Sequence, residues 1–147
     1  MKKINAVFKN ENYVKIKFKI TKTQHLLLKA KINGVTGNFI LDTGASNTCV
    51  DRVNIIFFEL KASLSKTKAT GAGANGITTQ IAKKNVLNIG KWTDSVFNIV
   101  ILDLSHINEA LVQHKVKPIH GIIGADVLLN GKGIIDYFNN YLYLIKD

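Results

Sequence analysis

The sequence predicts a single all-β domain with one or two short helices, and three observations support that fold class. Its 147 residues are enough to enclose one hydrophobic core, and two independent cores are not expected. Short apolar or alternating stretches, separated by turn residues, are typical of strands. Helical spacing of apolar residues is confined to short stretches. We therefore treat residues 1–147 as one domain with a basic N-terminal strand region at 1–23.

The first strands are predicted by alternation and by a turn signal. Lysine alternates with hydrophobic residues over 15–20, which is the period of a strand with one buried face. Asn33-Gly34 lies between two extended stretches and predicts a hairpin over 26–41. The apolar run Phe39-Ile40-Leu41 predicts an interior strand, buried on both faces, that leads directly into Asp42.

The later elements rest on similar patterns. Glycine clusters predict turns, apolar runs predict strands, and apolar residues spaced three and four positions apart predict helices. In chain order the predicted elements are a short helix at 51–60, a glycine-rich hairpin tip at 69–76, strands at 77–82, 84–89 and 95–102, one or two helical turns around 107–114, a buried strand at 119–124, a short helix at 125–129 and a hairpin over 134–145.

Composition excludes several classes of protein. Hydrophobic residues make up 46% of the chain and Pro118 is its one proline, so a folded domain is expected rather than a disordered or fibrous one. The single cysteine, Cys49, excludes an internal disulfide and zinc clusters built on cysteine; a reducing, cytoplasmic environment is therefore expected. No apolar run approaches the roughly 20 residues of a membrane-spanning helix, so membrane insertion is not expected.

The positive charge is concentrated near the N-terminus. The formal net charge is +10, and residues 1–31 hold nine lysines and one glutamate. Such a patch could attract phosphate, an anionic membrane or an acidic protein segment. Arg52 is the one arginine, and lysine lacks the planar fork that reads base edges, so base-specific recognition is disfavoured. A solvated lysine surface is favoured over a nucleic-acid role for this region.

The strongest candidate site begins at Asp42, immediately after the predicted interior strand. A carboxylate placed there costs several kcal/mol unless hydrogen bonds stabilise it. The sequence Asp42-Thr43-Gly44-Ala45-Ser46 supplies such donors, because Gly44 permits a tight turn that brings amides close and two residues carry hydroxyls. On residue type alone, a carboxylate that caps a turn is the simpler interpretation.

Three motifs in order favour a catalytic interpretation instead. Residues 39–46, the glycine-rich segment 71–76 and the run Ile122-Ile123-Gly124-Ala125-Asp126-Val127-Leu128 together resemble the retropepsin-like aspartic proteases, particularly single-domain bacterial members. The resemblance covers about residues 24–145. It implies a closed acid-protease barrel and an aspartic endopeptidase, a hydrolase that requires no cofactor or metal. Peptides or proteins would be its substrates.

The resemblance also implies roles for individual residues. Asp42 matches the catalytic aspartate, and Thr43 matches the threonine that joins the two active-site loops across a dimer axis. Ile122, Ile123 and Gly124 match the element that completes and supports the active-site loop together with Thr43 and Gly44. Segment 70–76 matches a flap that closes over substrate, and we expect it to be mobile without ligand. The implied substrate-binding residues are Gly44, Ala45, Ser46, Gly71, Ala72, Gly73 and Ala74.

Two departures from the family pattern concern the dimer and the loop region. Retroviral members carry an acidic residue and an arginine where this chain has Ser46 and Ala125, so their supporting ion pair is absent here. The segment around 103–118 is also longer than the corresponding segment of the viral members. One Asp-Thr-Gly occurs in the chain, and the mechanism needs two carboxylates that share a proton, so a homodimer that pairs two Asp42 side chains is expected. The alternative is a catalytically silent module of the same fold that binds peptide or nucleic acid.

Other reactive residues are given structural roles. Cys49 lacks the local signature of a nucleophile and is expected to be a buried thiol. Asp126 is expected to satisfy amides at a helix N-terminus. The four histidines show no metal-binding spacing, and surface or packing roles are expected for them: His25, His106, His114 and His120.

Overall fold

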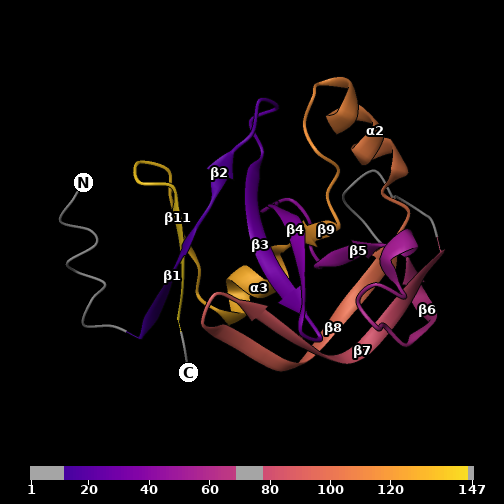
Figure 1. Ribbon diagram of the computed structural model, residues 1–147. Coiled ribbons are helices and arrows are strands. Elements are labelled where there is room, and N and C mark those ends of the chain that lie inside the picture. Colours follow the sequence, from indigo (N-terminus) through magenta and orange to yellow (C-terminus); the bar gives the residue numbers. More distant parts are fainter. Residues whose placement is uncertain (1–11, 69–77, 146–147) are drawn as a thin grey trace.

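The structure is a computed structural model that describes residues 12–68 and 78–145 (Figure 1). Within these residues, strands dominate and helices are short. The elements are β1 (Tyr13–Lys17), β2 (Lys19–Ile20), β3 (Leu26–Ile32), β4 (Val35–Leu41), β5 (Cys49–Asp51), the 3₁₀-helix η1 (Arg52–Asn54), β6 (Ala62–Lys68), β7 (Thr78–Ile89), β8 (Trp92–Leu102), α2 (Ser105–Gln113), β9 (Gly121–Ile123), α3 (Ala125–Asn130), β10 (Ile134–Asp136) and β11 (Tyr141–Ile145).

In the described part of the chain, six strands form a closed barrel in the order β3-β4-β9-β5-β8-β7, and a second pairing between β7 and β3 closes it. β2 and β6 extend this sheet beyond the barrel, and β1, β11 and β10 form a small separate sheet beside it (Figure 1). Most neighbours are antiparallel, but β9 runs parallel to β4, with Leu41 opposite Ile123. The predicted all-β class and the closed barrel are therefore confirmed.

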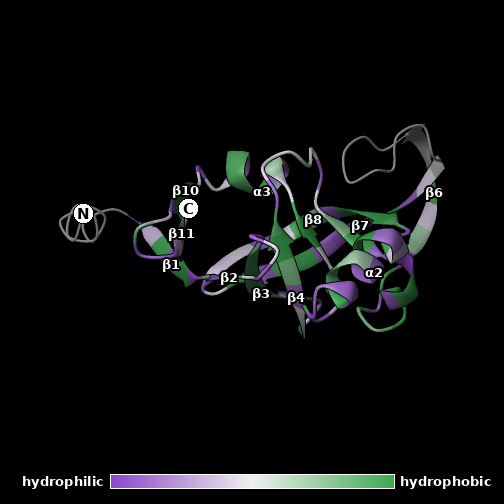
Figure 2. Cartoon of the chain, turned by 90° about the horizontal axis from the view of Figure 1, so that it is seen from above, coloured by the Kyte–Doolittle hydropathy of each residue, from purple (hydrophilic) through white to green (hydrophobic). Residues whose placement is uncertain are grey.

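Two apolar clusters hold the barrel together. The larger one fills the interior, where Phe39, Ile99 and Ile123 are fully excluded from solvent. The smaller one lies between β4, β5 and β9 on one side and α2 on the other, and it includes Cys49 and Leu111. Figure 2 shows hydrophobic residues along β4 and β8 in the centre of the molecule. None of the helices among the described residues is long and apolar enough to cross a membrane.

Several predicted elements are confirmed close to their expected bounds. The hairpin over 26–41 forms with Gly34 at a positive φ of 83°, as a two-residue turn requires. Phe39, Ile40 and Leu41 are all buried, as an interior strand predicts. α2, α3 and the final hairpin of β10 and β11 also occur where apolar spacing and alternation predict them.

Other predictions are wrong in detail. The strand predicted over 15–20 is two strands in different sheets, because Phe18 turns into the core and its amide donates to the Asn140 carbonyl (3.0 Å). The helix predicted at 51–60 is reduced to η1 and turns; Val53 and Ile56 are exposed, so no continuous apolar face contacts the core.

The long hairpin of the barrel also differs from the prediction. Strands predicted at 77–82 and 84–89 are one strand, β7, because a β-bulge absorbs the irregularity at Lys84, whose φ is 59°. The side chain of Asn85 holds this bulge by donating to the Ala82 carbonyl (2.9 Å). β6 was not predicted. The glycine-rich tip predicted at 69–76 connects β6 to β7 and lies outside the described residues.

Candidate active site

Asp42 stands at the end of β4, which is an inner strand of the barrel. β4 is paired along one edge with β3 and along the other with β9, so its carboxyl end is held on both sides. The Asp42 amide continues this pairing by donating to the Ile123 carbonyl at 2.9 Å. Asp42 itself is half-buried, whereas Leu41 before it is buried. The Asp42 carboxylate, at the end of a buried strand, thus lies at the boundary between core and solvent.

The loop after Asp42 turns back on its carboxylate. The Gly44 amide donates to Asp42 Oδ1 at 2.8 Å, and the Ala45 amide donates to the Asp42 carbonyl at 3.2 Å. This confirms the expectation that Gly44 would bring an amide to the carboxylate. Within residues 12–68 and 78–145, no group of three or more histidine, cysteine, aspartate or glutamate side chains is arranged to hold a metal ion.

A second loop crosses the first at close range. The Ala125 amide donates to the Ala45 carbonyl at 2.7 Å. A Cβ atom on Gly124 would lie 2.7 Å from that carbonyl oxygen and 2.8 Å from the backbone carbon of Asn47, closer than real Cβ atoms approach. Only glycine fits at this crossing, which gives a physical reason for the glycine of the Ile122-Ile123-Gly124 run. The structure therefore brings this run and the Asp42 loop together.

Hydrogen bonds between Thr48 and Asp126 hold the end of the Asp42 loop that leads into β5. Thr48 is fully buried, and its hydroxyl donates to Asp126 Oδ1 at 2.7 Å while accepting from the Gly124 amide at 3.0 Å. Its own amide donates to Asp126 Oδ2 at 2.9 Å. Asp126 also accepts from the Val127 amide at 2.8 Å, as its predicted place at a helix N-terminus requires. Its carboxylate therefore connects α3 to the Asp42 loop.

The sequence analysis missed Thr48. The partners of this residue lie 76 and 78 positions away, so no local pattern could identify them. A usable signal was present: a threonine directly before the buried strand β5 needs a partner for its hydroxyl, and Asp126 is the acid of the run at 122–128.

The outer face of the loop is open to solvent. Thr43, Gly44 and Ser46 are exposed, while Ala45 is buried between the two loops. Among the described residues, no hydrogen bond within the chain engages the Thr43 hydroxyl. The other predicted substrate-binding residues lie outside the described residues, and they are Gly71, Ala72, Gly73 and Ala74.

Cys49 lies close to this site, and its thiol is unreactive. It is buried, and burial raises the pKa of its thiol to about 12, with the carboxylates of Asp126, Asp42 and Asp51 adding to the effect. A thiol protonated at neutral pH is a poor nucleophile. The predicted role of Cys49 as a buried structural thiol is therefore supported.

His120 has a packing role. Its Nδ1 accepts from the Asn38 amide at 2.9 Å, and its ring stacks on Phe57 with centroids 5.1 Å apart. Burial lowers the pKa of His120, which favours the neutral ring that such an acceptor requires. It belongs to the wall beside β4 and not to the Asp42 loop.

Comparison with known proteins agrees with this geometry. A family model described as aspartyl protease matches residues 28–127, which include both loops. No protein in the curated set matches the sequence.

Solved structures that share the fold include the following three. A retropepsin-like aspartic protease from Rickettsia conorii is 19% identical with a TM-score of 0.60, over 90% of this chain and 89% of that one. EIAV protease complexed with the inhibitor HBY-793 is 16% identical with a TM-score of 0.55, over 76% and 91%. The retroviral protease-like domain of Ddi1 from Leishmania major is 16% identical with a TM-score of 0.54, over 82% and 87%. The chain therefore belongs to the aspartyl protease family and has the retropepsin-like fold.

Proposed function

We propose that this protein is an aspartic endopeptidase whose active form is a homodimer with two apposed Asp42 carboxylates. One observation carries the proposal: the Asp42 carboxylate is fixed by the Gly44 amide at the end of an inner strand, on a loop whose outer residues are exposed. The chain has one Asp-Thr-Gly motif, so a second carboxylate of the same kind has to come from a second copy. The exposed residue Thr43 is suited to contact that copy.

The chemistry follows from the proximity of two like charges. Two carboxylates a few ångströms apart cannot both ionise easily, so the pair holds one proton. The ionised Asp42 accepts a proton from water as the water oxygen attacks the scissile carbonyl carbon, and the protonated Asp42 donates its proton to the carbonyl oxygen. Collapse of the resulting diol breaks the C–N bond as the amine nitrogen takes a proton from one Asp42, while the other Asp42 takes a proton from a diol hydroxyl, so the pair again holds one proton. Peptide and water are thus converted to a carboxylic acid and an amine.

The direct test is the substitution Asp42→Asn, which keeps the side-chain volume and removes the proton exchange. We expect cleavage of a peptide library, read by mass spectrometry, to fall by about 10²–10⁴-fold or more. Asp103→Asn is the matched control, since Asp103 is exposed and pairs with Arg52 at 3.5 Å. Unchanged cleavage in Asp42→Asn would remove the proposal. A folded wild-type protein that cleaves nothing in the library would favour the silent peptide-binding alternative.

The homodimer has its own test. When wild type is mixed with an equal amount of Asp42→Asn protein and the subunits exchange, about a quarter of the dimers contain two intact Asp42 residues. Total activity should therefore fall to about a quarter of that of the same total amount of wild type. A monomeric enzyme would keep half, and that result would contradict the homodimer.

A further inference from the structure

A groove on the outer surface of the barrel carries a concentration of positive charge that the proposed active site does not use. It has a volume of about 890 Å³ and lies where β2, β3 and β4 meet β1 and the end of β7. None of its lining residues belongs to the Asp42 loop. Leu27 contributes half-buried apolar surface, whereas the Leu28 and Ala30 side chains are buried in the core. The described residues that line the groove include no acidic residue and five lysines: Lys15, Lys17, Lys19, Lys29 and Lys31.

The lysines fall into two groups. Lys15 and Lys17 are partly engaged, with their ammonium groups 4.1 Å and 4.6 Å from the centroid of the Tyr141 ring. The other three, Lys19, Lys29 and Lys31, are exposed and form no ion pair within residues 12–68 and 78–145. The groove therefore has uncompensated positive charge along one wall, which favours an anionic ligand.

The spacing of these charges follows a strand. Lys29 and Lys31 are two positions apart on β3, so both side chains leave the outer face of the sheet, about 7 Å apart. Leu27 precedes them on the same face and is paired with Lys19 on β2. An extended ligand with acidic groups at every second position would match this repeat.

β3 also has a backbone edge open in the middle of this groove. On the edge away from β4, β3 pairs with β2 at residues 26–27 and with β7 at residues 31–32. Residues 28–30 between them pair with no strand on that edge in the described part of the chain. An unpaired strand edge is a template for an extended peptide, which can add main-chain hydrogen bonds to side-chain contacts.

We propose that this groove binds an extended acidic peptide segment of another protein, with acidic side chains on Lys29 and Lys31 and its main chain along the open edge of β3 at residues 28–30. A nucleic-acid strand fits less well, because the residues lining the groove in the described chain include no arginine and no aromatic side chain on which bases could stack. A bilayer fits less well too, because the site is concave.

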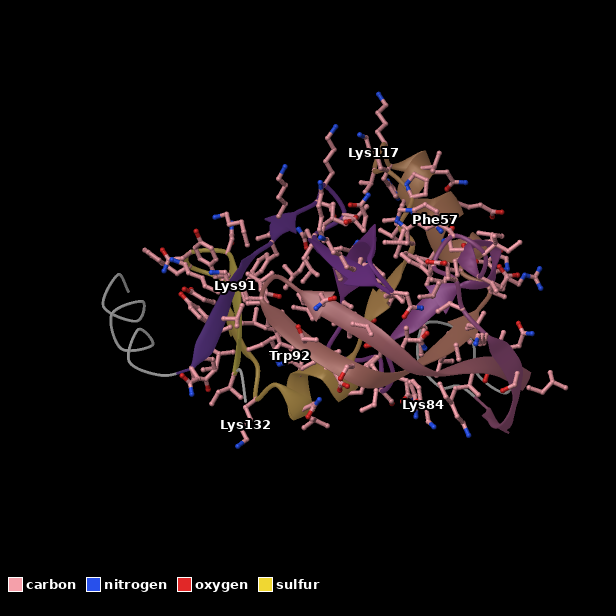
Figure 3. All side chains as sticks on the ribbon, turned by 60° about the horizontal axis from the view of Figure 1, so that its bottom comes forward. Phe57, Lys84, Lys91, Trp92, Lys117 and Lys132 are labelled. Carbon is pink, nitrogen blue, oxygen red and sulfur yellow. The ribbon has the colours of Figure 1, made fainter. Side chains whose placement is uncertain are left out.

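The test measures binding by fluorescence anisotropy in an Asp42→Asn background, so that cleavage of the probe cannot interfere. The probe is a labelled octapeptide in which glutamate alternates with valine, and a lysine–valine octapeptide is its control. Lys29→Glu combined with Lys31→Glu should weaken binding by about tenfold or more. Lys84→Glu combined with Lys132→Glu, on the lower rim of the molecule in Figure 3, makes the same charge change and should alter binding less than about twofold.

A second readout locates the ligand. Backbone hydrogen exchange at residues 28–30 should slow when the glutamate peptide binds. Equal weakening by both double variants would overturn the proposal, since net charge alone would then explain the attraction. Failure of the peptide to bind, with tight binding of a single-stranded oligonucleotide or of phosphatidylserine vesicles that the groove variant abolishes, would also overturn it. Because Asp42 is already replaced, none of these outcomes bears on proteolysis.

Discussion

Replacement of Thr48 by valine tests whether the Asp126 carboxylate stabilises the Asp42 loop. Valine has nearly the shape of threonine but lacks the hydroxyl, so Thr48→Val removes the 2.7 Å bond to Asp126 and leaves the Gly124 amide without its 3.0 Å acceptor. A hydrogen bond to a charged group contributes ~1.5–3 kcal/mol, and an unsatisfied buried donor costs ~1–3 kcal/mol. These contributions overlap, so we expect the free energy of unfolding to fall by about 3 kcal/mol, a large share of the total.

Thr48→Ser is the matched control, because it keeps the hydroxyl and loses one methyl group. It should lower the free energy of unfolding by only about 1 kcal/mol. Urea unfolding followed by circular dichroism at constant protein concentration measures both variants, with the midpoint and the slope fitted separately.

The decisive comparison is the order of the two variants. Because Thr48 is fully buried, loss of its methyl group and loss of its hydroxyl both lower the free energy of unfolding. If the hydrogen bonds matter more, the valine variant is the less stable of the two. If the valine variant proves as stable as the serine variant or more so, packing and not the hydrogen-bonded carboxylate holds the loop, and the reasoning is refuted.

Three further predictions concern single residues. Gly124→Ala should lower the free energy of unfolding, measured in urea, by more than about 2 kcal/mol, because the new Cβ would lie 2.7 Å from a backbone atom. Gly133→Ala should lower it less, because its Cβ would lie 2.7 Å from the end of a leucine side chain, which can move. The reverse order of the two variants would contradict this reasoning. Cys49 should react slowly with Ellman's reagent near pH 8 in the folded protein and quickly in concentrated urea, since burial raises its pKa to about 12; rapid reaction when folded would contradict it. Burial lowers the pKa of His120 below its ordinary value near 6.5, so its stabilising contribution is present above that pH and is lost as pH falls through the folded-state pKa. His120→Asn, which retains an acceptor for the Asn38 amide, should flatten the decline of unfolding free energy between about pH 7 and pH 5; an unchanged slope would count against this.

Elements that depend on neighbouring residues could be predicted from the sequence. Asn33-Gly34 specifies its own turn, and the hairpin over 26–41 forms as expected. The apolar run at 39–41 predicts a strand buried on both faces because no polar position interrupts it. The motif at Asp42 predicted both the position of the carboxylate and its bond to the Gly44 amide, because these atoms are two residues apart.

Elements that depend on distant contacts could not be predicted. Alternation over 15–20 continues past Phe18, yet the chain changes sheets there, because the Phe18 amide pairs with Asn140 across the fold. The segment 51–60 has hydrophobic residues, but the places available in the core accept Phe58 and Leu60 and leave Ile56 exposed.

The sequence by itself determined the all-β class, the position of Asp42 and the presence of one Asp-Thr-Gly per chain, since each is a property of adjacent residues or of a count. Tertiary structure alone decided that Thr48 meets Asp126 and that β3 has an open edge beside Lys29. The first contact joins residues 78 positions apart and exists because β5 pairs antiparallel with β9, with Cys49 opposite Ile122. The open edge exists because β2 ends before β7 begins to pair, and such pairing is settled by packing of the whole barrel.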